Sequence, residues 1–317
     1  MLKKLKQKII ISIVIAGAFY LSFTIYADLS NVISAFKKFN LLLIPLLLLL
    51  SFLNYFTRFF KWDYYLSVVN VRMKKLDSLS TFMSGLVMSV TPAKLGEVLK
   101  SVLVKEITGE PISKTAPIIL AERITDFLSL LILAITGAIV FKYGGNVTII
   151  VAAFFVLLIA IISNKKIAIS IINLFGKLPF FKKYILHIHS AYESSYQLLK
   201  LKPLILMTLL SLVSWGFECI GYFLILQNFN VDLGLLWASF SYGFSTIVGA
   251  ISMLPGGLGL TEGSLTFLLV QKNVSLDIAV ATTFIVRVVT LWFAVLVGIF
   301  SLTFYQKRFG KIKSNSL

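Results

Sequence analysis

The sequence contains a single cysteine, Cys219, and only two histidines in 317 residues. One cysteine cannot form an intramolecular disulfide, and no Cys-based metal site is indicated. Charged residues make up only 14% of the chain, compared with about a quarter in soluble domains. The GGLG string at 256–259 lacks the G-x-G-x-x-G spacing of a nucleotide-binding loop. These shortages exclude an ordinary soluble domain, and we expect no metal, no cofactor and no catalytic residue.

The chain is rich in apolar residues: 58% of it is hydrophobic and the mean hydropathy is +0.93. Several apolar windows reach about 20 residues, which is enough to cross a bilayer as a helix. A membrane β-barrel would instead show short alternating segments. The sequence therefore predicts an all-α, polytopic integral membrane bundle. The expected spans cover residues 9–27, 41–57, 115–141, 147–163, 204–226 and 276–305.

Acidic residues are the rarer charged type, with 13 Asp and Glu against 30 Lys and Arg, a net charge of +17. Cytoplasmic loops of membrane proteins collect Lys and Arg, so this excess predicts membrane topology and no nucleic-acid partner. The basic N-terminus leads into an apolar run without a small-residue cleavage site, which indicates an uncleaved first span. We expect a multi-pass protein of the cell membrane with both termini in the cytoplasm.

Two segments share the pattern S-x-x-P-x-x-L-G, at residues 89–96 and 252–259. Their prolines, Pro92 and Pro255, are separated by about half the length of the chain. A glutamate and then an arginine follow in each half, at nearly the same spacing: Glu97 with Arg123, and Glu262 with Arg287. The same order in both halves indicates an internal repeat. The turn residues expected in the two motifs are Pro92, Gly96, Pro255, Gly256, Gly257 and Gly259.

The excess of Lys and Arg falls on the cytoplasmic side only if the short broken segments around these motifs enter and leave the membrane on the same side. We therefore expect two inverted repeats, each with a re-entrant hairpin. Residues 1–163 form the first membrane half, with its hairpin at 79–107. Residues 164–202 form a basic amphipathic linker at the cytoplasmic interface. Residues 203–317 form the second half, with its hairpin at 235–270 and a basic tail.

In this interpretation the hairpins create a binding site for an anion. Proline removes a backbone donor and ends the incoming half-helix, while glycine permits a tight turn. The next half-helix then points its electropositive N-terminus, with free N–H groups, into the cavity. An anionic group such as a lipid phosphate can bind there. Lys94, in the first turn, is a candidate phosphate contact, although it can equally snorkel to the cytoplasm.

Charged side chains inside the predicted spans are the other candidates, because a charge at bilayer depth costs at least about 2–3 kcal/mol unless it is paired or hydrated. They form either internal ion pairs or the wall of a hydrophilic groove, and we favour the groove. Glu97 and Glu262 can pair with the arginine of either half or carry coupling protons. Arg58 and Lys61 fit an interfacial anchor or a substrate site, and Glu218 is a weaker candidate. The expected substrate path comprises Lys94, Glu97, Glu122, Arg123, Asp126, Glu262 and Arg287.

The segments "SVTPAKLGEVLKSVLVKEITG", "AERITDFLSLLI" and "SMLPGGLGLTEGSLTFLL" resemble the flippase-like transmembrane region of lysylphosphatidylglycerol synthases. They equally resemble stand-alone bacterial and archaeal membrane proteins that share this region. The resemblance covers about residues 5–305 and implies two inverted repeats that translocate a lipid. In full-length synthases a soluble cytosolic domain makes the aminoacyl lipid. This chain ends at Leu317 without room for that domain, so we do not carry lysyl transfer over.

Our leading hypothesis is a flippase for a polar-headgroup lipid, either an aminoacyl-phospholipid or a glycosylated or phosphorylated polyprenyl lipid. An integral-membrane transferase is the first alternative, with Glu97 or Asp126 as acid or base. A membrane anchor for a separate lipid-modifying enzyme, bound through residues 164–202, is the second. The expected partners are membrane lipids with anionic headgroups. A homo-oligomer is compatible with the sequence.

Overall fold

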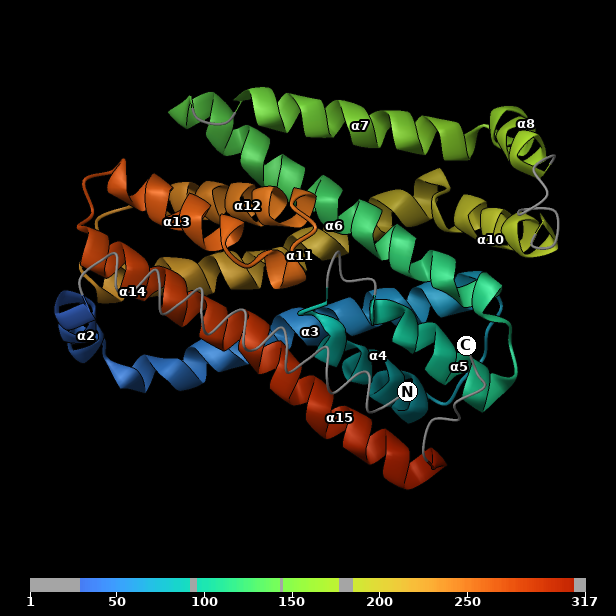
Figure 1. Cartoon of the computed structure of the whole chain (residues 1–317), viewed down its shortest axis with the longest axis horizontal. Coiled ribbons are helices and arrows are strands. Elements are labelled where there is room, and N and C mark those ends of the chain that lie inside the picture. Colours follow the sequence, from blue (N-terminus) through green and yellow to red (C-terminus); the bar gives the residue numbers. More distant parts are fainter. Residues whose placement is uncertain (1–28, 92–95, 143–144, 177–184, 311–317) are drawn as a thin grey trace.

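The computed structural model describes residues 29–91, 96–142, 145–176 and 185–310, and every regular element in these ranges is a helix (Figure 1). Four helices are long and apolar enough to cross a membrane. The protein is therefore an all-α polytopic membrane protein, as the sequence predicts. The four spans are Leu41–Val68, Ile112–Phe141, Leu201–Asn228 and Leu276–Phe309.

The described elements fall into two runs of similar order. The first run comprises α2 (Leu29–Lys38), η1 (Leu41–Leu43), α3 (Ile44–Val68), α4 (Lys75–Gly85), η2 (Leu86–Met88), α5 (Leu99–Thr108), α6 (Ile112–Phe141) and α7 (Gly145–Ser163). The second comprises α8 (Lys165–Gly176), α10 (Ile185–Leu198), α11 (Leu201–Asn228), α12 (Leu235–Ile251), η4 (Pro255–Gly257), α13 (Leu260–Val270), α14 (Leu276–Arg287), η5 (Val288–Trp292) and α15 (Phe293–Phe309).

The expected second span, 41–57, is too short. Helix α3 continues to Val68, through the charged and aromatic stretch that the sequence suggested as an interface segment. Lys61 and Trp62 in this stretch are buried against other helices. These polar side chains lie in the interior of the protein. Hydropathy alone cannot distinguish such an interior stretch from one at a membrane surface. The end of the last span also differs: α14, η5 and α15 form one continuous helix with a π-helical segment at Val288–Trp292.

The two runs repeat their local structure at an offset of about half the chain. Asn70 ends the turn after α3 with φ 54°, and Asn230 ends the turn after α11 with φ 56°. The next amide bonds back in both turns, from Val71 to the Leu66 carbonyl and from Val231 to the Leu226 carbonyl. Asparagine tolerates this left-handed conformation better than most residues. An α-helix follows each turn: α4 in the first run and α12 in the second.

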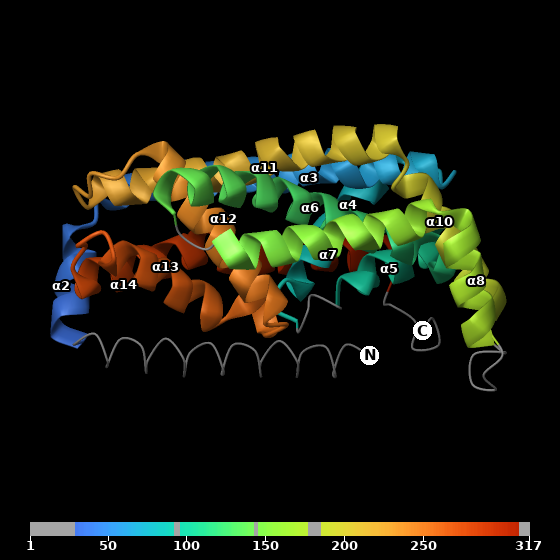
Figure 2. The same cartoon turned by 90° about the horizontal axis from the view of Figure 1, so that it is seen from above.

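Equivalent helices of the two runs pack against each other. Helices α3 and α11 lie side by side and run in opposite directions (Figures 1 and 2). Helix α12 packs on α6, and α4 packs on α15, so each half contributes its short helix to the long helix of the other. The inverted relation of the two repeats stays a prediction. The orientation of each half in the membrane stays a prediction.

The hairpin at 235–270 is described in full, and α12 and α13 pack against each other across η4. Gly256, Gly257 and Gly259 have φ values of 62°, 69° and 91°, a region that other residues rarely adopt, so this turn requires its glycines. In the hairpin at 79–107, α4 packs on α5. Pro92 lies outside the described residues, and the Gly96 amide donates to the Thr91 hydroxyl at 3.0 Å. Both hairpins exist as helical pairs, and their re-entry into the membrane stays a prediction.

The basic linker forms α8 and α10. Helix α10 packs along α6, so the face that carries Tyr192 contacts protein. Lys165 on α8 lies 3.0 Å from Glu193 on α10, and this hydrogen bond raises the pKa of the lysine. The location of the linker at the cytoplasmic interface stays a prediction.

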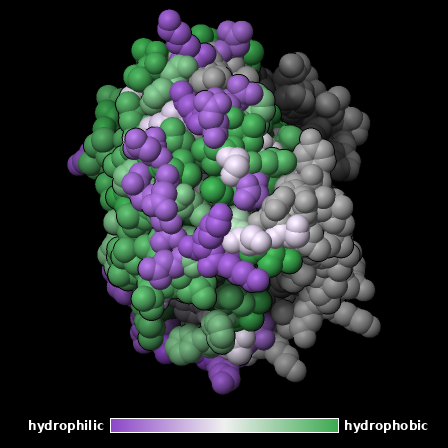
Figure 3. Space-filling view, turned by 90° about the vertical axis from the view of Figure 1, so that its left-hand side faces the viewer, coloured by the Kyte–Doolittle hydropathy of each residue, from purple (hydrophilic) through white to green (hydrophobic). Residues whose placement is uncertain are grey.

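One end of the bundle carries hydrophilic side chains between apolar flanks (Figure 3). This end contains the turns after α11 and α13, with Asn230, Asp232, Gln271 and Asn273 exposed. Apolar side chains are exposed along the helices, as on Phe267 and Phe300. Such a surface suits a bundle whose end meets water and whose sides meet lipid.

Candidate functional site

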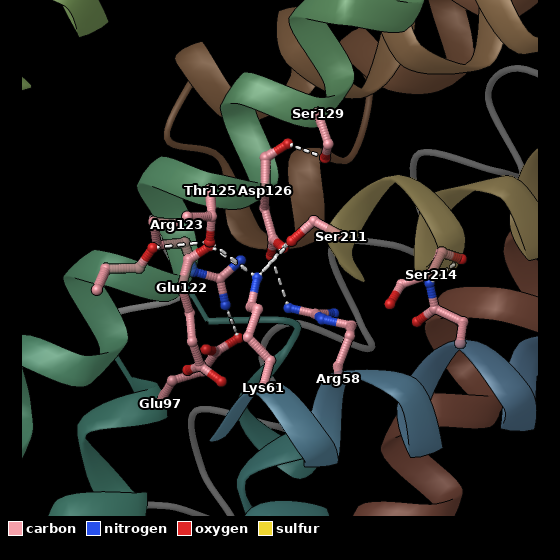
Figure 4. Close-up of polar contacts among 12 residues, drawn as sticks. Arg58, Lys61, Glu97, Glu122, Arg123, Thr125, Asp126, Ser129, Ser211 and Ser214 are labelled. Atoms are coloured by element: carbon pink, nitrogen blue, oxygen red, sulfur yellow. Dashed lines mark hydrogen bonds and ion pairs between the residues drawn. The ribbon is translucent and has the colours of Figure 1, made fainter. Parts of the chain in front are cut away.

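A buried ion cluster joins α3 to α6 and α11. Asp126 on α6 receives Lys61 Nζ at 2.5 Å on one carboxylate oxygen and Arg58 Nη2 at 2.9 Å on the other (Figure 4). Ser211 on α11 donates to the same carboxylate at 3.0 Å. One anion therefore compensates two cations, and the cluster carries a net positive charge.

Lys61 lies deepest in this cluster, with a side chain only 1% exposed. Besides Asp126, its ammonium lies within hydrogen-bond distance of the Thr125 hydroxyl at 3.1 Å, the Ser211 hydroxyl at 2.7 Å and the Glu122 carbonyl at 3.2 Å. Burying a lysine is tolerable only when its charge is paired and its donors are bonded. Four acceptors from two helices meet both conditions.

A second cluster lies between the first hairpin and α6. Glu97 pairs with Arg123, and Lys100 Nζ lies 2.5 Å from Glu122 and 3.8 Å from Glu97. The Lys100 ammonium also lies 4.7 Å from the centre of the Trp62 ring, at cation–π distance. These contacts hold the start of α5 against α6.

The second hairpin has its own ion pair. Glu262 on α13 accepts from Arg287 Nε at 2.7 Å, and Glu262 is fully buried. Its other oxygen accepts the Gly259 amide at 2.8 Å, and Arg287 also donates to the Gly256 carbonyl. A side chain of the protein thus takes the amide of the N-cap residue Gly259, one of the N–H groups at the start of this half-helix that we had expected to be free for a ligand. Arg287 now holds the turn in place.

A small polar cavity of about 90 Å³ lies between the two halves. Arg58 and Glu218 line it from α3 and α11, and Arg287 lines it from α14. Glu218 accepts a hydrogen bond from the Tyr242 hydroxyl at 2.5 Å. A second, larger cavity of about 520 Å³ has mainly apolar walls from α6, α7 and α12. The two cavities share the wall residues Trp215, Thr246, Gly249, Ala250, Gly256 and Gly257.

The repeat contributes equivalent residues to the polar cavity. Tyr55 and Trp215 occupy corresponding positions on α3 and α11, and both line the cavity. The same holds for Arg58 and Glu218, one turn further along each helix. The cavity therefore lies where corresponding helices of the two halves meet. The charges are not symmetric, because an arginine in the first half corresponds to a glutamate in the second.

The structure brings together most of the predicted path. Each glutamate that follows a motif pairs with the arginine of its own half, and a role of these glutamates in carrying coupling protons stays a prediction. Glu122 pairs with α5, Arg123 with the first hairpin and Asp126 with α3. Lys94 lies outside the described residues. Sequence analysis missed Lys100, and left Arg58 and Lys61 undecided, although their charges inside an apolar stretch were a usable signal.

Comparison with known proteins supports the resemblance. The family model of the lysylphosphatidylglycerol synthase transmembrane region matches residues 9–298. A UPF0104 membrane protein of Methanocaldococcus jannaschii is 29% identical over 221 residues, which are 66% of this chain and 90% of that protein. A UPF0104 membrane protein of Pyrococcus horikoshii is 21% identical over 301 residues, 86% of this chain and 90% of that protein.

Proposed function

Because the chain belongs to the family of the lysylphosphatidylglycerol synthase transmembrane region, we propose that it moves a lipid with an anionic headgroup between the leaflets of the membrane. The headgroup enters the polar cavity between the halves while a hydrocarbon chain occupies the apolar cavity beside it. The proposal concerns transport and assigns no catalytic residue.

The observation that carries this proposal is that two unlike cavities lie side by side and share wall residues. The polar one is small and has two guanidinium groups, from Arg58 and Arg287, in its wall. The apolar one is lined by aromatic and aliphatic side chains such as Phe127, Phe154 and Phe155. A ligand that satisfies both must have an anionic end and a long apolar end. Membrane lipids with a phosphate headgroup have this chemistry, and arginine is well suited to phosphate.

Unused donors support an acceptor-rich ligand. Arg58 Nε and Trp215 Nε1 are buried and have no hydrogen-bond partner among the described residues. A buried donor without an acceptor costs about 1–3 kcal/mol. Because both side chains line the polar cavity, phosphate oxygens that reach these donors would recover part of that free energy.

The buried ion pairs of Arg123 and Asp126 form part of the proposed transport path. Arg123 and Asp126 line the apolar cavity, and Arg58 links Asp126 to the polar one. A headgroup phosphate that moves between the cavities can exchange places with a carboxylate as the partner of an arginine. Asp126 keeps Lys61 as a partner when a phosphate takes Arg58, so this exchange strands no buried charge, which keeps the barrier low.

The experiment uses proteoliposomes that contain the purified protein and a fluorescent phosphatidylglycerol, whose transfer is measured by dithionite quenching. We expect the Arg287→Gln and Arg58→Gln variants to lose at least about 90% of the wild-type rate, since one lost charge-assisted contact is worth about 1.5–3 kcal/mol. Lys165→Gln removes an exposed charge and is the matched control. Equal rates in empty liposomes and in liposomes with the wild-type protein would refute the proposal for this lipid.

A phosphorylated polyprenyl lipid is the second substrate in the same assay. The two lipids share the phosphate and differ in the apolar chain, so their relative rates report what the apolar cavity accepts. Thermal unfolding of each variant shows whether a slow rate reflects lost folding.

A further inference from the structure

Glu218 is a buried carboxylate that the proposed function does not use. It lies on α11, is 8% exposed, and lines the polar cavity that also contains Arg58 and Arg287. A phosphate held by these two arginines would therefore enter the same small cavity as a second negative charge. Two anions in a water-poor cavity repel each other strongly.

The charges around the two cavities already balance without this extra anion. When all of them are ionised, the cations and carboxylates in this part of the described structure balance. The cations are Arg58, Lys61, Lys100, Arg123 and Arg287, and the carboxylates are Glu97, Glu122, Asp126, Glu218 and Glu262. A phosphodiester lipid makes the balance negative by one charge, and a single proton restores it.

We infer that Glu218 takes up one proton when the anionic headgroup binds, so that lipid movement is coupled to proton movement. This inference rests on the proposed function. Among the carboxylates of the described residues, Glu218 is the one in the wall of the polar cavity that also holds Arg58 and Arg287. Glu218 accepts a hydrogen bond from the neutral hydroxyl of Tyr242, which can remain when the carboxyl group is protonated.

The groups that face Glu218 come from three neighbouring helices. Tyr55 and Arg58 face it from α3, Tyr242 from α12 and Arg287 from α14. Cys219 follows it on its own helix and is buried. Both arginines contribute positive charge to the wall of this cavity. A bound phosphate neutralises that influence, which makes proton uptake on binding the favoured step.

The proton step changes no other bond. A proton from water forms an O–H bond with the Glu218 carboxylate as the lipid enters, and the same bond breaks when the headgroup leaves. One negative and one positive charge thus move together, and a proton gradient across the membrane would drive the lipid in the direction of proton flow.

The direct test is to count protons by calorimetry. Short-chain phosphatidylglycerol is titrated into the detergent-solubilised protein in two buffers of different ionisation enthalpy. This phosphodiester keeps its charge between about pH 5 and pH 8, so its own titration does not contribute. We expect uptake of about one proton per lipid by the wild type, and an affinity that rises by up to about tenfold per unit of falling pH.

Two variants locate the proton. Glu218→Gln resembles the protonated carboxyl group and retains an acceptor for Tyr242, so we expect it to bind the lipid with no proton uptake and no pH dependence. Glu193→Gln removes an exposed carboxylate on α10 and should behave as the wild type. Binding by the wild type without proton uptake overturns the inference, and so does full uptake by the Glu218→Gln variant.

The outcomes separate this inference from the proposed function. Lipid transfer without proton uptake leaves the function standing and removes only the coupling, whereas binding of neither phosphatidylglycerol nor the phosphorylated polyprenyl lipid removes both. Phosphatidylethanolamine provides a further check, because its amine could contact a glutamate directly. If Glu218→Gln weakens binding of that lipid alone, Glu218 is an amine contact and the coupling is wrong.

Discussion

The buried cluster around Asp126 yields the sharpest stability prediction. Asp126 lies between Lys61 and Arg58, and its side chain is only 4% exposed. Replacing it with asparagine keeps the size of the side chain and removes the charge that both cations share. Replacing Lys61 with methionine instead removes one cation, and leaves Asp126 with Arg58 and the Ser211 hydroxyl.

The expected magnitudes follow from this asymmetry. Breaking a buried ion pair by removing one partner costs about 3–5 kcal/mol. Asp126→Asn strands two cations, so we expect the free energy of unfolding to fall by about 5 kcal/mol. Lys61→Met leaves the carboxylate paired, so we expect a loss of about 3 kcal/mol. The double variant leaves only Arg58 stranded, and its loss should fall short of the sum by up to about 3 kcal/mol.

The assay is equilibrium unfolding in mixed detergent micelles with increasing dodecyl sulfate, followed by tryptophan fluorescence. Lys165→Met serves as the control, because Lys165 is 47% exposed and its loss should change stability by no more than about 0.5 kcal/mol. If Lys61→Met is as stable as this control, or if the two cluster variants add without coupling, the reasoning about the buried charges is refuted.

Three further predictions use the same unfolding measurement. Glu262→Gln strands the Arg287 charge and should cost about 3–5 kcal/mol, part of which a second Arg287→Gln change recovers; no recovery would contradict the pairing. Gly249→Ala places a methyl group where the Thr261 hydroxyl lies and should cost about 1–3 kcal/mol, with partial relief from Thr261→Ala. Asn230→Ala forces alanine to φ 56° and should cost about 1 kcal/mol, whereas Asn230→Gly should be nearly neutral.

The helices were the easiest part to predict. Long apolar runs form membrane helices because every backbone polar group must be bonded inside the segment, so hydropathy locates them without tertiary information. The spans expected at 115–141 and 204–226 match α6 and α11 within a few residues. The span at 41–57 was too short because buried charges such as Lys61 lower the hydropathy of the second part of this helix.

The candidate site was predictable only in part. The spacing of Glu97 to Arg123 and of Glu262 to Arg287 indicated a repeated pair, and the structure confirms both ion pairs. Which arginine each glutamate meets depends on how α5 and α13 pack, and the sequence leaves that open. Sequence analysis missed Lys100 because a single lysine on a short amphipathic segment resembles a surface residue.

Residue order and hydropathy alone were enough to establish a helical membrane protein and to predict two similar halves, since both properties reside in local stretches of the chain. The tertiary structure alone placed Arg58 and Glu218 from corresponding helices in one cavity, and placed an apolar cavity against the same wall residues. The reason is geometric. A helix presents a different residue every 100° or so around its axis, and only the packing of α3 against α11 selects which of those residues meet.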